Sequence, residues 1–148
     1  MKPTNCRLNA RAFAGFLALL VTGCTNTSHQ MPAFYNVLAE QTGQNGRSCV
    51  DVDDIRGYGV LKHDVISVDG RDGYYLMTVL PGCMSLQTSS RALFDDHFGD
   101  ICGGGQSRIR TDGNACTIRS VFEFSDRSAA FDTYNTAKDA YSAAKAQR

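Results

Sequence analysis

The sequence has no tryptophan, only three prolines and no excess of either charge, since 15 basic side chains balance 15 acidic ones. After residue 23 the balance becomes 12 basic against 15 acidic side chains, so the rest of the chain is weakly acidic. Sequence-independent binding of nucleic acid needs clustered lysine and arginine, so we expect no nucleic-acid partner. No second apolar run of about 18 residues follows the N-terminal one, so we expect no membrane-spanning helix there.

Several catalytic and metal-binding signatures are missing as well. No two cysteines are spaced Cys-x-x-Cys, which argues against a thiol oxidoreductase, and no Gly-x-Ser-x-Gly nucleophile elbow is present. The acidic groups lack the spacing of an EF-hand, and no His-x-x-x-His pair offers a zinc site. The sequence therefore predicts no cofactor.

Cysteine, by contrast, is frequent, with six in 148 residues. Cys6 and Cys24 belong to the N-terminal region, which leaves an even number in the rest of the chain: Cys49, Cys83, Cys102 and Cys116. In an exported protein this count predicts two disulfides. The sequence does not choose among the three pairings. Each bridge would close a loop of tens of residues and contribute about 3–4 kcal/mol of stability.

Residues 1–23 have the pattern of a secretory signal peptide, with basic residues between positions 2 and 11 and an apolar segment over 12–21. The end of this segment, Val21-Thr22-Gly23-Cys24, resembles a bacterial lipobox. That resemblance implies that Cys24 carries the acyl chains, palmitate among them, which anchor the protein to a membrane. The residue after the anchor is Thr25, whereas an inner-membrane retention signal usually has Asp there. We therefore expect the outer membrane, on the side that faces the periplasm.

The segment 24–31 is small and polar, which predicts a flexible tether. A single disulfide-stabilised, β-rich domain is then expected over residues 32–148. Apolar residues at helical spacing predict a short helix over 32–41, ended by Gly43. At the other end of the domain, Ser125 or Asp126 is suited to cap a helix over 126–146 that carries one apolar stripe.

The most apolar stretch of the domain is Tyr74–Leu80, which ends at Pro81-Gly82 and predicts a strand buried on both faces. Shorter strand patterns are found at 55–61, 65–68, 91–94, 106–110 and 115–124, with loops expected at 84–90 and 95–105. In the last strand, alternation places Ile118 and Phe122 on one face and Val121 on the other, which predicts a half-buried strand. We expect an α+β fold with a small five- to six-stranded antiparallel barrel or rolled sheet.

Asp95, Asp96 and His97 are the candidates for a metal or acid–base site, with Asp100 nearby. Hard cations prefer several oxygen ligands from a loop, and a histidine can act as a base. A solvated loop is the more ordinary interpretation of the same residues. The three glycines at 103–105 are expected to let the chain turn sharply beside a bridged Cys102.

A set of spaced residues resembles a family of small, uncharacterised bacterial envelope lipoproteins. The set consists of Cys49, Tyr75-Leu76, Cys83-Met84-Ser85-Leu86, Cys102 and Cys116-Thr117-Ile118. The resemblance covers residues 49–121 and implies an envelope location and disulfides. The family has no assigned activity, so the resemblance implies none for this chain.

These observations favour a non-enzymatic, lipid-anchored periplasmic protein that binds an envelope partner or contributes to envelope maintenance. One alternative is a metal-assisted periplasmic hydrolase that uses the loop of Asp95, Asp96 and His97. Another is a carrier of a small ligand, which would need an apolar barrel interior with room for that ligand.

Overall fold

The structure is a computed structural model that describes residues 33–96 and 99–147. The predicted signal peptide, the lipidation candidate Cys24, the tether over 24–31 and His97 lie outside the described residues.

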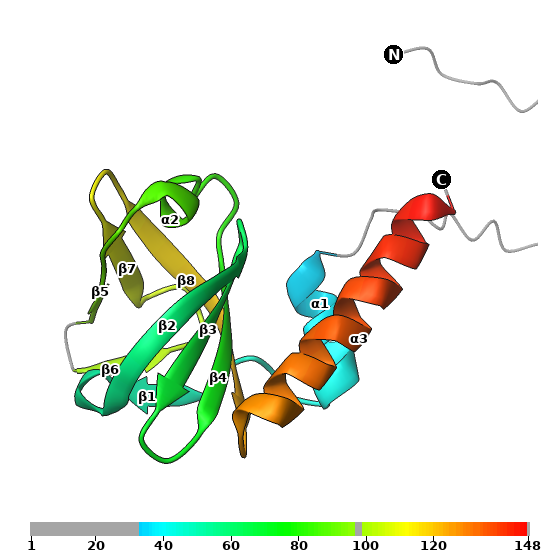
Figure 1. The fold of residues 1–148 in the computed structure, drawn as a ribbon, viewed down its shortest axis with the longest axis horizontal. Coiled ribbons are helices and arrows are strands. Elements are labelled where there is room, and N and C mark those ends of the chain that lie inside the picture. The colour runs from blue at the N-terminus through cyan, green and yellow to red at the C-terminus, as the bar shows by residue number, and fades with distance from the viewer. Residues whose placement is uncertain (1–32, 97–98, 148) are drawn as a thin grey trace, which may run out of the picture.

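Six antiparallel strands form one sheet that is rolled into a half-barrel, in the order β2-β3-β4-β8-β7-β5 (Figure 1). The strands are β2 (Ile55–Lys62), β3 (Val65–Gly70), β4 (Tyr74–Val79), β5 (Ala92–Asp95), β7 (Arg108–Thr111) and β8 (Ala115–Phe124). Two shorter strands, β1 (Cys49–Asp51) and β6 (Asp100–Cys102), pair with each other below it. The predicted β-rich fold with a rolled antiparallel sheet is confirmed.

Strand β4 lies in the middle of the sheet, and all six of its residues are buried. Its side chains alternate between two core clusters, because successive residues of a strand point to opposite faces. Tyr75 and Met77 join the cluster on the concave face, whereas Tyr74 and Leu76 join the cluster beneath the helices. The predicted strand buried on both faces is therefore confirmed.

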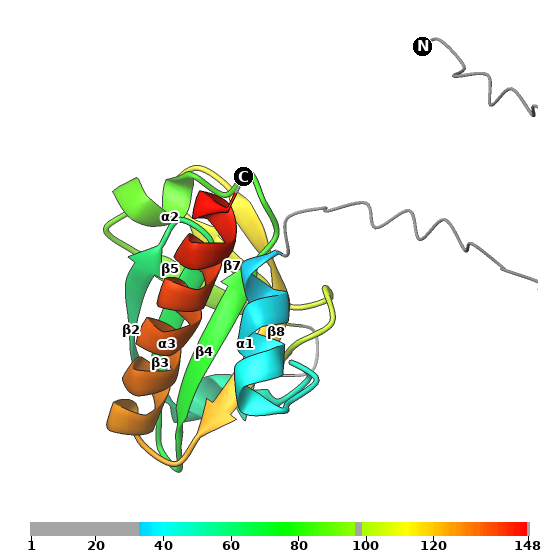
Figure 2. The ribbon, with the colours of Figure 1, turned by 90° about the vertical axis from the view of Figure 1, so that its right-hand side faces the viewer.

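The helices α1 (Phe34–Thr42) and α3 (Arg127–Ala146) pack side by side over the convex face of the sheet (Figure 2). Helix α1 ends at Gly43, whose φ of 67° lies in the left-handed region and whose N–H donates to the carbonyl of Ala39. Helix α3 begins after Asp126, whose carboxylate accepts a hydrogen bond of 3.0 Å from the N–H of Ala129. Both predicted helices are confirmed, and Asp126 is the cap.

Three details differ from the sequence predictions. The loop predicted at 84–90 contains one turn of helix, α2 (Ser85–Thr88), which buries Leu86. The loop predicted at 95–105 contains strand β6, and its partner β1 begins at Cys49. Strands of three residues carry little periodic signal, so their pairing depends on contacts between distant segments.

The third difference concerns the faces of β8. Val79 pairs with Ile118 and Thr78 pairs with Ser120, so the strand has one extra residue between these pairs. This bulge shifts the alternation, and Ile118 joins Val121 in the concave cluster while Phe122 packs beneath the helices. The prediction that Ile118 and Phe122 share a face is wrong, and the middle of β8 is buried on both faces rather than on one.

None of the helices within the described ranges is both long and apolar enough to span a membrane.

Candidate functional site

Two disulfides resolve the pairing that the sequence left open. Cys49 pairs with Cys102 across β1 and β6, and Cys83 pairs with Cys116, which joins the segment after β4 to the start of β8. The bridges span 53 and 33 residues of sequence. The predicted pair of disulfides is confirmed.

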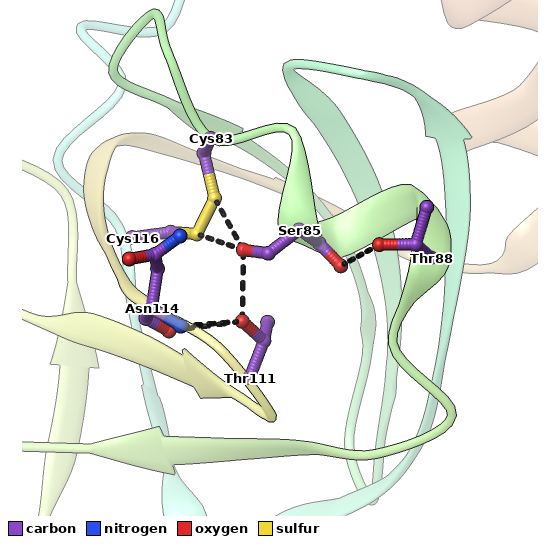
Figure 3. Close-up of a disulfide and its surroundings, with 6 residues drawn as sticks. All are labelled: Cys83, Ser85, Thr88, Thr111, Asn114 and Cys116. Atoms are coloured by element: carbon purple, nitrogen blue, oxygen red, sulfur yellow. Dashed lines mark hydrogen bonds between the residues drawn. A yellow bond between two sulfur atoms is a disulfide. The ribbon is translucent and has the colours of Figure 1, made fainter.

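The Cys83–Cys116 bridge is surrounded by a small set of hydroxyl groups (Figure 3). The Oγ of Ser85 lies 3.9 Å from the sulfur of Cys83 and 3.8 Å from that of Cys116. The Oγ1 of Thr111 lies 2.8 Å from the same Ser85 oxygen and accepts from the N–H of Asn114. These contacts tie the loop that carries α2 to the β7–β8 hairpin, so this bridge has a structural role.

The glycines at 103–105 meet two different backbone requirements. Gly104 and Gly105 have φ values of 129° and 90°, which favour glycine. At Gly103 the reason is close approach, because a Cβ there would overlap the carbonyl oxygen of Gly46 and lie 2.8 Å from the N of Val121. The predicted sharp turn beside the bridged Cys102 is confirmed, and the close approach of residue 46 adds a second constraint.

Beside this turn, two adjoining polar cavities form a cleft between the end of β5, the glycine turn and the start of β7. One cavity of about 250 Å³ is lined by Asp95, Asp96, Gln106, Arg108 and Arg110. The other, of about 290 Å³, is lined by Arg47, Asp96, Asp100, Cys102, Gly103, Gly104, Gln106 and Ser107. Asp96 and Gln106 line both cavities, so we treat them as one cleft, the Gln106 cleft.

Ser107 forms the buried wall of the Gln106 cleft. Its side chain is only 1% exposed, and its hydroxyl donates a hydrogen bond of 2.6 Å to the carboxylate of Asp96. The same oxygen accepts a 2.9 Å hydrogen bond from the backbone N–H of Cys102. The serine therefore holds β6 and the segment after β5 together, and its burial keeps the hydroxyl away from the open part of the cleft.

The candidates Asp95, Asp96 and Asp100 come to different positions. Asp95 accepts a 2.7 Å hydrogen bond from the Nε of Arg110, Asp96 contacts Ser107, and Asp100, at the start of β6, pairs in register with Asp51. Over residues 33–96 and 99–147, no group of three His, Cys, Asp or Glu side chains is placed to hold a metal ion.

Two arginines of the Gln106 cleft were not singled out by the sequence. Arg47 lies over the glycine turn, where its Nη1 would be 3.3 Å from a Cβ on Gly104, and Arg108 lies at the start of β7. Both are exposed, and neither forms an ion pair with a carboxylate of the described residues. A guanidinium presents planar donors that match a carboxylate or phosphate. The cleft thus has two cations available for an anionic group.

The titratable groups with raised pKa lie away from this cleft. Burial raises the pKa of Tyr75, and the nearby carboxylate of Glu123 raises it further. Burial also raises the pKa of Tyr134, whose hydroxyl donates to the carbonyl of Leu61 at 3.3 Å. Both tyrosines belong to the core clusters, so these shifts reflect packing rather than a reactive site.

Comparison with known proteins gives a family but no activity. A model described as a family of unknown function, DUF6491, matches residues 7–145. The chain belongs to this family. No curated protein and no solved structure matches it. Membership of DUF6491 therefore assigns no activity to the Gln106 cleft.

Proposed function

We propose that this member of DUF6491 is a lipid-anchored protein of the bacterial cell envelope that binds a partner and catalyses no reaction. The proposed location is the outer membrane, facing the periplasm, with the anchor on Cys24. The lipobox-like sequence before Cys24 supports the anchor. The two disulfides support export, because disulfides persist in oxidising compartments and are rare in the cytosol.

The binding role is supported by the state of the polar groups in the Gln106 cleft. An enzyme needs a nucleophile or a base that can reach its substrate. Here the hydroxyl of Ser107 and the carboxylate of Asp95 are both used to hold neighbouring segments. Among the cationic groups of the cleft, the exposed guanidinium groups of Arg47 and Arg108 form no ion pair with a carboxylate of the described residues and can contact a ligand. We propose that they bind an acidic segment of an envelope protein.

A small-ligand carrier gains no support from the concave face of the sheet. Side chains from β3, β4, β8 and the β1–β6 pair fill this face, and Ile66, Met77 and Ile101 are fully buried there.

The anchor is tested by incorporation of radiolabelled fatty acid. We expect label in the full-length protein and none in Cys24→Ala. Equal labelling of the two proteins would refute the anchor, whatever the cleft binds.

The cleft is tested with a photo-cross-linking amino acid at Gln106 in the full-length protein, in living cells. We expect a discrete cross-linked adduct that disappears when Arg47→Gln and Arg108→Gln are combined. Arg91→Gln is the matched control, because Arg91 is exposed and does not line either cavity of the cleft. An adduct that survives loss of both cleft arginines would contradict the charge-based binding.

The hydrolase alternative has its own test. Stoichiometric metal in the purified protein that is lost in Asp96→Ala combined with His97→Ala would favour a metal-assisted enzyme over a binding protein.

A further inference from the structure

We infer that one end of the domain lies against the lipid bilayer through the exposed side chains of Leu80 and Met84. This inference rests on the proposed anchor at Cys24 and adds a second, non-covalent contact with the membrane. We call the segment from Leu80 to Met84 the apex loop.

The apex loop exposes apolar side chains without an evident role in packing. Leu80 is 43% exposed and Met84 is 63% exposed, whereas the preceding strand β4 is buried throughout. Between them, Pro81 and Gly82 are also exposed, and Gly82 has a φ of 99°. Exposed leucine and methionine side chains four residues apart in one tight loop are suited to enter the interfacial region of a bilayer.

The apex loop lies at the end of the molecule where the described chain begins. Figures 1 and 2 both place the start of α1, the end of α3 and α2 toward the same end, opposite the β3–β4 hairpin. A series of contacts connects the two regions: the ring of Phe34 faces the Nζ of Lys62 at 4.8 Å, and this Nζ lies 3.2 Å from the carboxylate of Asp64. The carbonyl of Asp64 then accepts from the N–H of Val79, the residue before the apex loop.

The length of chain between the anchor and the domain keeps this end near the membrane. Nine peptide bonds link Cys24 to Ala33, where the described chain begins. Fully extended, such a segment spans at most about 30 Å, and a flexible one has an r.m.s. span of about 17 Å. The start of α1, and with it the apex loop, therefore stays within reach of the lipid headgroups.

The distribution of charge favours the same orientation. The opposite end of the domain carries the β3–β4 hairpin, with Asp69 and Asp72 beside Arg71, and the paired strands β1 and β6, with Asp51 and Asp100. Near the apex loop, by contrast, the carboxylate of Asp64 is paired with the ammonium of Lys62 at 3.2 Å. An anionic lipid surface repels the acidic end and tolerates the near-neutral one.

The absence of tryptophan gives a direct test, because a single introduced indole becomes the only one in the protein. Full-length lipidated Met84→Trp is reconstituted in vesicles of phosphatidylethanolamine and phosphatidylglycerol, with or without brominated acyl chains. We expect a shift of emission to shorter wavelength on reconstitution and loss of fluorescence with the brominated lipid. Leu80→Trp should behave in the same way, and Asp72→Trp, at the β3–β4 hairpin, should show neither effect.

Flotation of the same vesicles separates the two proposals. Protein that fails to float with lipid refutes the anchor at Cys24. Protein that floats, but whose Met84→Trp and Leu80→Trp fluorescence is no more quenched than that of Asp72→Trp, overturns the contact of the apex loop while leaving the anchor in place.

Discussion

Replacement of Gly103 by alanine is expected to remove a large part of the stability of the fold. The added methyl would overlap the carbonyl oxygen of Gly46, and the backbones of Gly46 and Gly103 are both held by hydrogen bonds to neighbouring segments. The overlap can be removed only if the segments that contain residues 46 and 103 move apart. That movement breaks three backbone hydrogen bonds: Val121 N–H to Gly46 at 2.9 Å, Gly103 N–H to Ser48 at 3.2 Å, and Ser48 N–H to Val121 at 3.2 Å.

Each such bond contributes a net of about 1 kcal/mol, so the free energy of unfolding should fall by about 3 kcal/mol. Small domains have only about 5–15 kcal/mol in total. Urea unfolding of the oxidised protein, followed by far-UV circular dichroism, should show a midpoint lower by about 2 M.

Gly113→Ala is the matched control, because a Cβ at Gly113 has no atom within 4 Å and its φ is not positive. We expect this variant to change the free energy of unfolding by less than about 0.5 kcal/mol. If Gly103→Ala unfolds at the same urea concentration as Gly113→Ala, the result would contradict the close approach of residues 46 and 103.

Three further predictions concern the core and the bridges. Lys62→Met should lower the free energy of unfolding by about 1–2 kcal/mol, because the ammonium lies between two aromatic rings; Lys138→Met, on the exposed side of α3, should change the urea midpoint little. Replacing Cys83 and Cys116 together by serine should cost about 4 kcal/mol, read from thermal unfolding against the wild type; an unchanged melting temperature would contradict the bridge. The pKa of Tyr75 is raised above 10.0 in the folded state, so folding favours the neutral phenol. The stability that this difference contributes is present below pH 10 and is lost as the pH rises further. Between about pH 9 and about pH 11, the wild type should therefore lose stability more steeply than Tyr75→Phe, and parallel curves would argue against this linkage.

The parts of the fold that the sequence predicts are those specified by local patterns. The run Tyr74–Val79 is apolar without interruption, and this identifies a strand with two covered faces before any partner is known. Asp126 before a helical stripe, and Gly43 after one, fix helix ends through bonds to residues three or four positions away. Such signals need no knowledge of the rest of the chain.

The parts that sequence reasoning missed depend on contacts between distant segments. The bulge that turns Ile118 away from the face of Phe122 exists only in relation to the register of β4. The pairing of β1 with β6 joins residues about fifty positions apart, and three-residue strands have no period to detect.

Contacts between distant segments also explain why the sequence identified only part of the candidate site. Asp95 and Asp96 were identified as polar neighbours in sequence, and both line the Gln106 cleft. Arg47 lies between α1 and β1, far in sequence from the other cleft residues. The alternation of Arg108 and Arg110 around the buried Ile109 was the one local signal that could have indicated a charged face on β7.

The two disulfides overlap in sequence, since Cys83 lies between Cys49 and Cys102, and Cys116 lies beyond both. A pulling force applied between residues 33 and 147 would therefore travel through the sulfur atoms and bypass most of the backbone from 49 to 116. Under such tension, the segments outside the bridged region can be drawn out first: α1 and the loop after it, and α3 with most of β8. The part of the chain that forms β2, β3 and β4 would stay in a closed loop until a thiol cut the Cys49–Cys102 bridge.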